Sequence, residues 1–149
     1  MAAVRLPISE YRSGTRHLSD REFQTAFEDC TLASTAFRHY DHIRLAWIVL
    51  GERSLDDAIA WMRAAIARFA MHHLGDTRLY HETLTIAWMR LVAAARRASP
   101  QAASFDEFAA RHAELLDQSL PYQFYSEAQL KSGTARAEWI DPDVMPLPV

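Results

Sequence analysis

The sequence predicts an all-α protein, a single-domain bundle of five to six helices. Apolar residues recur every three or four positions over most of the 149 residues, which is the spacing of an amphipathic helix. No stretch alternates apolar and polar residues as a half-buried strand would. The length suits one domain with a core of its own. We expect an N-terminal arm over residues 1–18, the bundle over residues 19–140, and an extended, proline-containing tail over residues 141–149.

The first helix is marked by a capping box. Ser19 and Glu22 have the spacing at which a hydroxyl and a carboxylate each bind a free backbone N–H at a helix start. Phe23 and Phe27 follow one turn apart, so they share a face. The pattern predicts a helix over about residues 19–31.

The second helix is expected from Ser34, a favourable N-cap residue, to Leu50, with Gly51 as its stop. Its apolar residues fall on one face at about 100° per residue. Asp41 and Arg44 lie beside this face. We expect them to form a solvated pair on the surface.

The third and fourth helices follow after short connections. Ser54 is the N-cap of the third, and Gly75 ends it. The fourth is expected from about Tyr80 to about Ala98, where Pro100 prevents its continuation.

The last third of the chain carries weaker helix signals. Ser104 and Glu107 form a second capping box, which opens a fifth helix. Pro121 interrupts the pattern. Ser126 and Gln129 indicate a further short helix.

Composition argues against several classes of function. The net charge is −3 and no basic stripe is present, so we do not expect a nucleic-acid partner. The longest apolar run, residues 45–50, is too short to cross a membrane, and residues 1–7 lack the apolar core of a signal peptide. A cytoplasmic protein without a membrane partner is expected. Cys30 is the single cysteine, which excludes an internal disulfide and suits a small core residue.

Five histidines are expected at one end of the bundle. His39 and His42 open the second helix, His72 and His73 close the third, and His81 opens the fourth. Short connections make neighbouring helices antiparallel, so the start of one helix lies beside the end of the next.

The helical wheel separates these side chains by direction. His39, His73 and His81 lie within the inward faces of their helices, and His42 flanks them three positions after His39. Glu82 points roughly 100° away from His81. Inward side chains of facing helices are how bundles assemble metal sites. The pattern therefore predicts a metal site with His39, His42 and His81 as ligands, and with His73 or Glu82 as the fourth.

Imidazole ligands suit several divalent transition metals. Three nitrogens with an open position suit zinc, two histidines with a carboxylate suit non-haem iron, and an all-histidine set suits copper. The leading hypothesis is a small metalloenzyme, for instance a metal-dependent oxidoreductase, acting on a small molecule. Its candidate catalytic groups are Glu82, as a general base or an outer partner of a ligand, with Tyr80 and Tyr125 near the pocket mouth.

Two other functions fit the same residues. The first is a metal-free pocket that binds an anionic or polar small molecule, with protonated histidine and Arg78 near its mouth. The second is a helical interaction module without catalysis. A single histidine on an apolar face is more often a hydrogen-bonded core residue than a ligand, and His72 and His73 suit the negative end of a helix dipole.

Two motifs resemble those of a known family. Residues 37–42 have the pattern F-x-H-x-x-H and residues 80–83 read Y-H-E-T. With residues 125–126 and 139–142, they resemble a family of small uncharacterised all-helical bacterial proteins, over roughly residues 20–148. The resemblance implies no activity. It implies that four polar residues belong to the family's motifs: His39, His42, His81 and Glu82.

Overall fold

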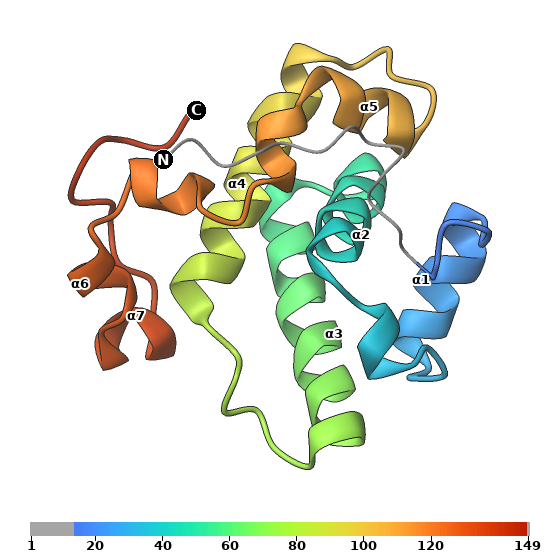
Figure 1. The fold of residues 1–149 in the computed structure, drawn as a ribbon, viewed down its shortest axis with the longest axis horizontal. Helices are drawn as coiled ribbons and strands as arrows, with labels where there is room; N and C mark the ends of the chain where they lie inside the picture. Colours follow the sequence, from blue (N-terminus) through green and yellow to red (C-terminus); the bar gives the residue numbers. More distant parts are fainter. Residues whose placement is uncertain (1–13, 149) are drawn as a thin grey trace.

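The computed structural model describes residues 14–148 and contains helices but no strand within them (Figure 1). The predicted all-α class is confirmed. The α-helices are α1 (Asp20–Glu28), α2 (His39–Glu52), α3 (Leu55–Leu74), α4 (Glu82–Ala98), α5 (Phe105–Arg111), α6 (Glu127–Leu130) and α7 (Gly133–Ala137). Short 3₁₀ turns lie at Ser34–Ala36, Ala113–Leu116 and Leu120–Gln123. Over the described residues, every helix is too short or too polar to span a bilayer.

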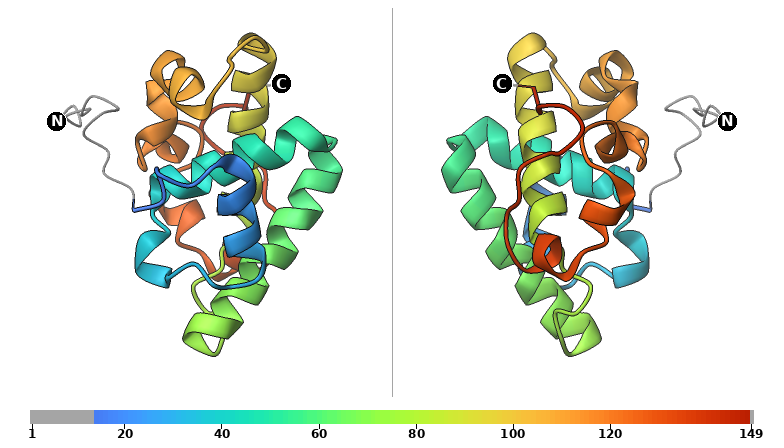
Figure 2. Two further views of the ribbon diagram at one scale, coloured as in Figure 1. Left: turned by 90° about the vertical axis from the view of Figure 1, so that its right-hand side faces the viewer. Right: turned by 90° about the vertical axis from the view of Figure 1, so that its left-hand side faces the viewer.

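Three long helices form the centre of the fold. α3 runs antiparallel to α4, as the short connection predicts, and α2 packs against both (Figure 1). α1 covers α2 and α3, whereas α7 packs against α4 on the opposite side of the molecule (Figure 2). The first residue of α2, His39, thereby contacts α4 at Trp88, the seventh residue of that helix.

Aromatic side chains fill the core where α1 meets α3. Phe23 and Phe27 are fully buried, as their spacing predicts. The Phe27 ring lies 4.5 Å from the centroids of both Phe37 and Phe69. Such aromatic pairs add about 0.5–1.5 kcal/mol each beyond the area that they bury. This cluster fixes the segment before α2 against α3.

Several predicted helix ends are confirmed by their capping contacts. Ser19 and Glu22 form the capping box, with bonds of 3.1 and 3.0 Å. The Ser54 hydroxyl accepts the N–H of Asp57 at 3.2 Å. Gly75 ends α3 with φ 77°, in the left-handed region that favours glycine.

The predicted start of the second helix at Ser34 is wrong. Residues 34–36 form only a 3₁₀ turn, which no side chain caps, and α2 begins at His39. The Asp41 carboxylate accepts the backbone N–H of Arg38 at 2.9 Å and holds Arg38 in an extended conformation. The helix start is therefore set by a carboxylate three residues inside it, and not by the upstream serine.

The predicted solvated pair of Asp41 and Arg44 is also wrong, because both side chains are buried. The chain before α1 covers them. The Thr15 hydroxyl donates to Asp41. The Arg44 guanidinium donates to the Thr15 carbonyl at 3.1 Å and the Leu18 carbonyl at 2.7 Å, and it pairs with Asp20 at 3.0 Å. These contacts replace the water that burial removes.

The two chain ends differ in how much of them is described. Of the expected arm, residues 1–13 lie outside the described residues, and residues 14–18 pack on α2 through Thr15. The described part of the expected tail has no helix. It is tied to the preceding segment by the Val144 N–H, which donates to the Phe124 carbonyl at 2.9 Å.

The buried carboxylate gives a first testable prediction. Asp41→Ala removes the buried acceptor of the Thr15 hydroxyl and of the Arg38 N–H, so both donors lose this bond. We expect a loss of about 3 kcal/mol or more in the free energy of unfolding, measured by urea denaturation. Asp57→Ala is the control, since Asp57 is exposed in the first turn of α3 and should cost under about 1 kcal/mol. Equal losses in the two variants would contradict this role.

Candidate functional site

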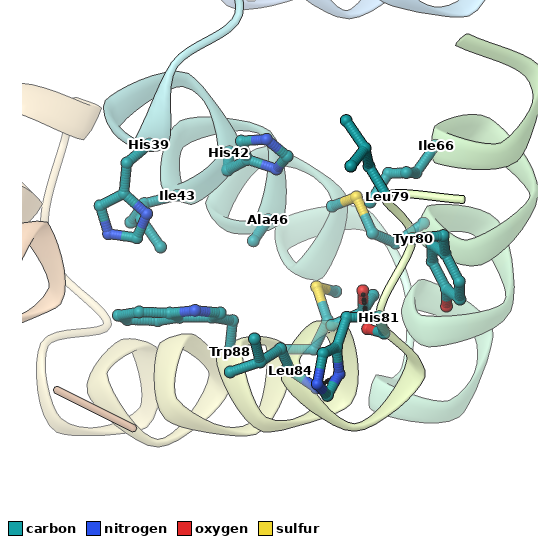
Figure 3. Close-up of a pocket in the computed structure, with 13 residues that line it drawn as sticks. His39, His42, Ile43, Ala46, Ile66, Leu79, Tyr80, His81, Leu84 and Trp88 are labelled. Atoms are coloured by element: carbon teal, nitrogen blue, oxygen red, sulfur yellow. Dashed lines mark hydrogen bonds between the residues drawn. The ribbon is translucent and has the colours of Figure 1, made fainter. Parts of the chain in front are cut away.

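A pocket of about 240 Å³ opens between α2, α3, α4 and the loop before α4 (Figure 3). Its walls are mostly apolar, with three histidines, a tyrosine and a threonine among them. The lining comes from α2 (His39, His42, Ile43, Ala46), α3 (Met62, Ile66), the loop (Leu79, Tyr80, His81) and α4 (Leu84, Thr85, Trp88, Met89). The structure therefore brings three of the four predicted metal ligands to one pocket.

His39 is the first residue of α2, and its ring lies over Trp88, with centroids 4.7 Å apart (Figure 3). Its Nε2 is 2.8 Å from the Leu115 carbonyl, which can only accept, so Nε2 carries the hydrogen. Nδ1 is then the acceptor of the ring. Burial lowers the pKa of His39, against the opposing effects of the Leu115 carbonyl and the Asp117 carboxylate. The ring is held neutral and oriented.

His42 has the freer ring. It packs on Phe37, with centroids 4.1 Å apart, and among the described residues no protein group hydrogen-bonds to either of its nitrogens. The residue is exposed and lines the pocket. Desolvation lowers the pKa of His42, and neighbouring His39 lowers it further. A neutral imidazole offers the pocket one donor and one acceptor.

His81 has a structural role, because both of its ring nitrogens bond backbone groups. It is the N-cap of α4, and its Nδ1 accepts the N–H of Leu84 at 3.1 Å. Its Nε2 is 2.7 Å from the Leu130 carbonyl, so this nitrogen donates. Both nitrogens therefore have protein partners, and the tautomer is fixed. A metal ion could take His81 only if one of these bonds were broken.

Glu82 lies outside the pocket lining and holds Tyr80 at its edge. The Tyr80 hydroxyl donates to Glu82 at 2.7 Å, and the Arg63 Nε donates to the same carboxylate at 2.9 Å. Burial, with the bond to Glu82, raises the pKa of Tyr80 to about 12. Burial alone would raise the pKa of Glu82, but the bonds from Arg63 and Tyr80 outweigh it and lower that pKa. Glu82 thus joins α3 to the loop and α4.

His73 is not among the residues that line the pocket. Its angle on α3 is right, because it follows the lining residue Ile66 by seven positions, but it lies about 10 Å further along the helix axis. There it packs against Phe69 and His72, with ring centroids 4.4 and 4.8 Å away. Its Nε2 is buried with no hydrogen-bond partner among the described residues.

Tyr125 is also distant from the pocket lining. Its side chain is fully buried and its hydroxyl donates to the Ile140 carbonyl at 2.8 Å, beside the ring of Trp139. Burial and the nearby Asp141 raise the pKa of Tyr125 to about 12. The residue therefore anchors the C-terminal segment.

The four predicted ligands do not form one set in this geometry. Within residues 14–148, no three His, Cys, Asp or Glu side chains gather closely enough to hold a metal ion together. Among the residues that the structure describes, His39 and His42 keep ring nitrogens that bond no protein group. His81 is engaged and His73 lies elsewhere. Metal binding itself stays a prediction.

A second hollow of about 320 Å³ adjoins the pocket, since four side chains line both: His39, His42, Leu84 and Trp88. Arg38 and Gln118 line only the second hollow. Sequence reasoning overlooked Arg38, although it lies inside the F-x-H-x-x-H motif. It favoured Arg78, which is outside both linings and pairs with Asp76 at 2.9 Å.

No family model matches the chain, and neither a curated protein nor a solved structure matches it. The resemblance carried by the two motifs therefore stays a prediction.

The capping role of His81 gives a second prediction. His81→Ala removes the cap and leaves the Leu130 carbonyl unpaired, so we expect a loss of about 1–3 kcal/mol in the free energy of unfolding. Asn is a good N-cap, so His81→Asn should retain a large part of that stability. His72→Ala is the control, because His72 is exposed, and should change stability by under about 0.5 kcal/mol. Equal losses for Asn and Ala at position 81, measured in urea, would contradict the capping role.

Glu82 gives a third prediction, on pH dependence. The lowered pKa of Glu82 means that its stabilisation is present above the usual glutamate pKa and is lost as pH falls through the lowered value. Glu82→Gln should therefore cost about 1–2 kcal/mol near neutral pH, and this difference should shrink between about pH 5 and about pH 3. Glu127→Gln, at an exposed ion pair, is the control and should cost little. A pH-independent difference would contradict the argument.

Proposed function

We propose that this protein binds a small, mostly apolar molecule in the pocket between α2, α3 and α4, with the imidazoles of His42 and His39 bonding its polar group. Apolar side chains from three helices supply the walls, of which Ile66 and Leu84 are half-buried and so in reach of a ligand. Removing apolar surface from water gains about 25 cal/mol per Å². Mostly apolar pockets with a few convergent polar groups are the usual small-molecule sites.

The observation that carries the proposal is the His42 ring. It faces an apolar pocket, and no protein group among the described residues uses its nitrogens. The Nδ1 of His39, beside it, is likewise an acceptor without a protein donor there. A ligand hydroxyl would satisfy both rings, because it can accept from the His42 N–H and donate to His39 Nδ1. A carbonyl or carboxylate oxygen would accept from the His42 N–H alone. In each case the apolar body of the ligand displaces water from the walls.

A metal-dependent reaction is the second candidate, as the sequence suggests. It is favoured by one observation, that His39 and His42 line the same pocket one helical turn apart and each keep a nitrogen without a protein partner. Zinc, copper or iron bound there would need further ligands, from the small molecule or from a His81 released from its cap. The ion would supply a Lewis acid or a redox centre.

The binding proposal is tested with 1-octanol, a neutral probe, by titration calorimetry. Ile66→Trp places a large ring in the pocket and should weaken octanol binding at least about tenfold, because the filled volume is no longer available. Leu74→Trp is the matched control on the same helix. Leu74 is exposed and outside the lining, so octanol affinity should stay within about twofold.

Thermal unfolding of both variants would check that each is folded, and Leu84→Trp provides a second block on α4. Absence of octanol binding by the unchanged protein would contradict the proposal. So would equal affinities in the blocked and control variants.

The metal candidate is tested by elemental analysis of protein purified without a histidine tag. It predicts about one zinc, copper or iron ion per chain, lost in His42→Ala. Because the pKa values of His39 and His42 are both lowered, the ion should be released only at a pH below the usual imidazole range. A metal content far below one per chain, or full loading of His42→Ala, would contradict this candidate.

A further inference from the structure

The second hollow differs from the pocket in its polar lining. Arg38, Gln118 and the exposed Tyr122 line it, together with the apolar Phe37, Pro121 and Leu130 and the four side chains that it shares with the pocket. A molecule in the pocket therefore has a more polar hollow next to it, along His39 and His42. The arrangement suits a ligand with two unlike ends.

Arg38 is the charged side chain of this hollow. No carboxylate within residues 14–148 forms an ion pair with its guanidinium, and its side chain is exposed. Its backbone is fixed, because its N–H donates to the buried Asp41. A guanidinium presents paired donors that match the two oxygens of a carboxylate. Within the described residues, Arg38 is thus a cation that no protein carboxylate neutralises, on a backbone that Asp41 holds in place.

Apart from Arg38, the hollow has no ionised side chain in its described lining, and the helix dipole beside it favours an anion. His39 and His42 are neutral donors or acceptors, since the pKa of each is lowered. Asp117, the carboxylate that acts on His39, accepts from the Ser119 N–H and hydroxyl and does not line the hollow. The hollow also lies at the first turn of α2, where the helix dipole is positive.

We infer that the ligand is an amphipathic carboxylate, whose alkyl or aryl body fills the pocket and whose carboxylate lies in the second hollow, bound by Arg38. The inference rests on the proposed function, because the pocket must first accept the apolar body. It adds the chemical class of the ligand and the residue that recognises it. Gln118 would donate a further hydrogen bond to the carboxylate.

Three probes of one chain length test the apolar pocket and the carboxylate site separately. They are octanoate, 1-octanol and octylamine, each titrated calorimetrically below its micelle concentration. We expect octanoate to bind about tenfold tighter than octanol, and octylammonium to bind more weakly than octanol. The octanoate advantage should fall as salt is added, because Arg38 is exposed and its charge is screened.

The decisive variant is Arg38→Gln, which removes the charge and keeps a polar side chain. It should weaken octanoate binding about tenfold and leave octanol within about twofold. Arg78→Gln is the matched control, because Arg78 is exposed and outside both hollows, and it should change neither affinity.

The outcomes distinguish the two proposals. Octanol binding without an octanoate advantage, or an Arg38→Gln effect equal for both probes, would overturn the inference and leave the proposed function standing. An octanoate advantage lost in Arg78→Gln would overturn it as well. Binding of none of the three probes by the unchanged protein would overturn the proposed function and the inference together.

Discussion

The buried carboxylate of Asp41 fixes where α2 begins, and the pocket depends on that start. It holds the backbone N–H of Arg38 and the hydroxyl of Thr15, so the helix cannot extend upstream. The chain instead turns at Phe37, whose ring packs into the aromatic core and supports His42. A carboxylate buried in this way needs hydrogen-bond donors, and Thr15 in the chain before α1 supplies one of them. The hydrogen bond from Arg38 to Asp41 at the start of α2 therefore helps to place Arg38, His39 and His42, which line the two hollows.

Three histidines reach the same pocket in different chemical states, because their partners differ. Each ring nitrogen of His81 binds a backbone group, so this residue is structural. His39 has one nitrogen on a carbonyl and one without a protein partner, and the described residues leave both nitrogens of His42 unused. Their spacing in the sequence predicts the same role, that of a metal ligand, for all three. Backbone groups far along the chain, at Leu115 and Leu130, create the difference.

The sequence predicts the fold well because periodicity and capping are local. It predicts the site in part, since a helical wheel gives the direction of a side chain but not its level along the bundle. The prediction that His73 joins the site is not met because His73 lies too far along the helix axis. α3 has twenty residues and α2 fourteen, so the end of α3 extends past the pocket. The predicted exposure of Asp41 and the predicted place of Tyr125 near the pocket mouth differ from the structure for another reason. The segments that cover them, before α1 and after α7, pack through long-range contacts that no local pattern predicts.

The position of Arg38 outside the apolar pocket agrees with the cost of burying a charge. A guanidinium inside the pocket would lose its hydration, a cost of several kcal/mol unless it were paired there. At Arg38 the cation stays exposed, so it keeps water when the hollow is empty and exchanges that water for an anion at small cost. His39 and His42 line both hollows, and their lowered pKa values favour neutral rings. A protonated histidine at either position would attract the ligand carboxylate away from Arg38 and toward the apolar pocket. Neutral rings do not compete with Arg38 in this way.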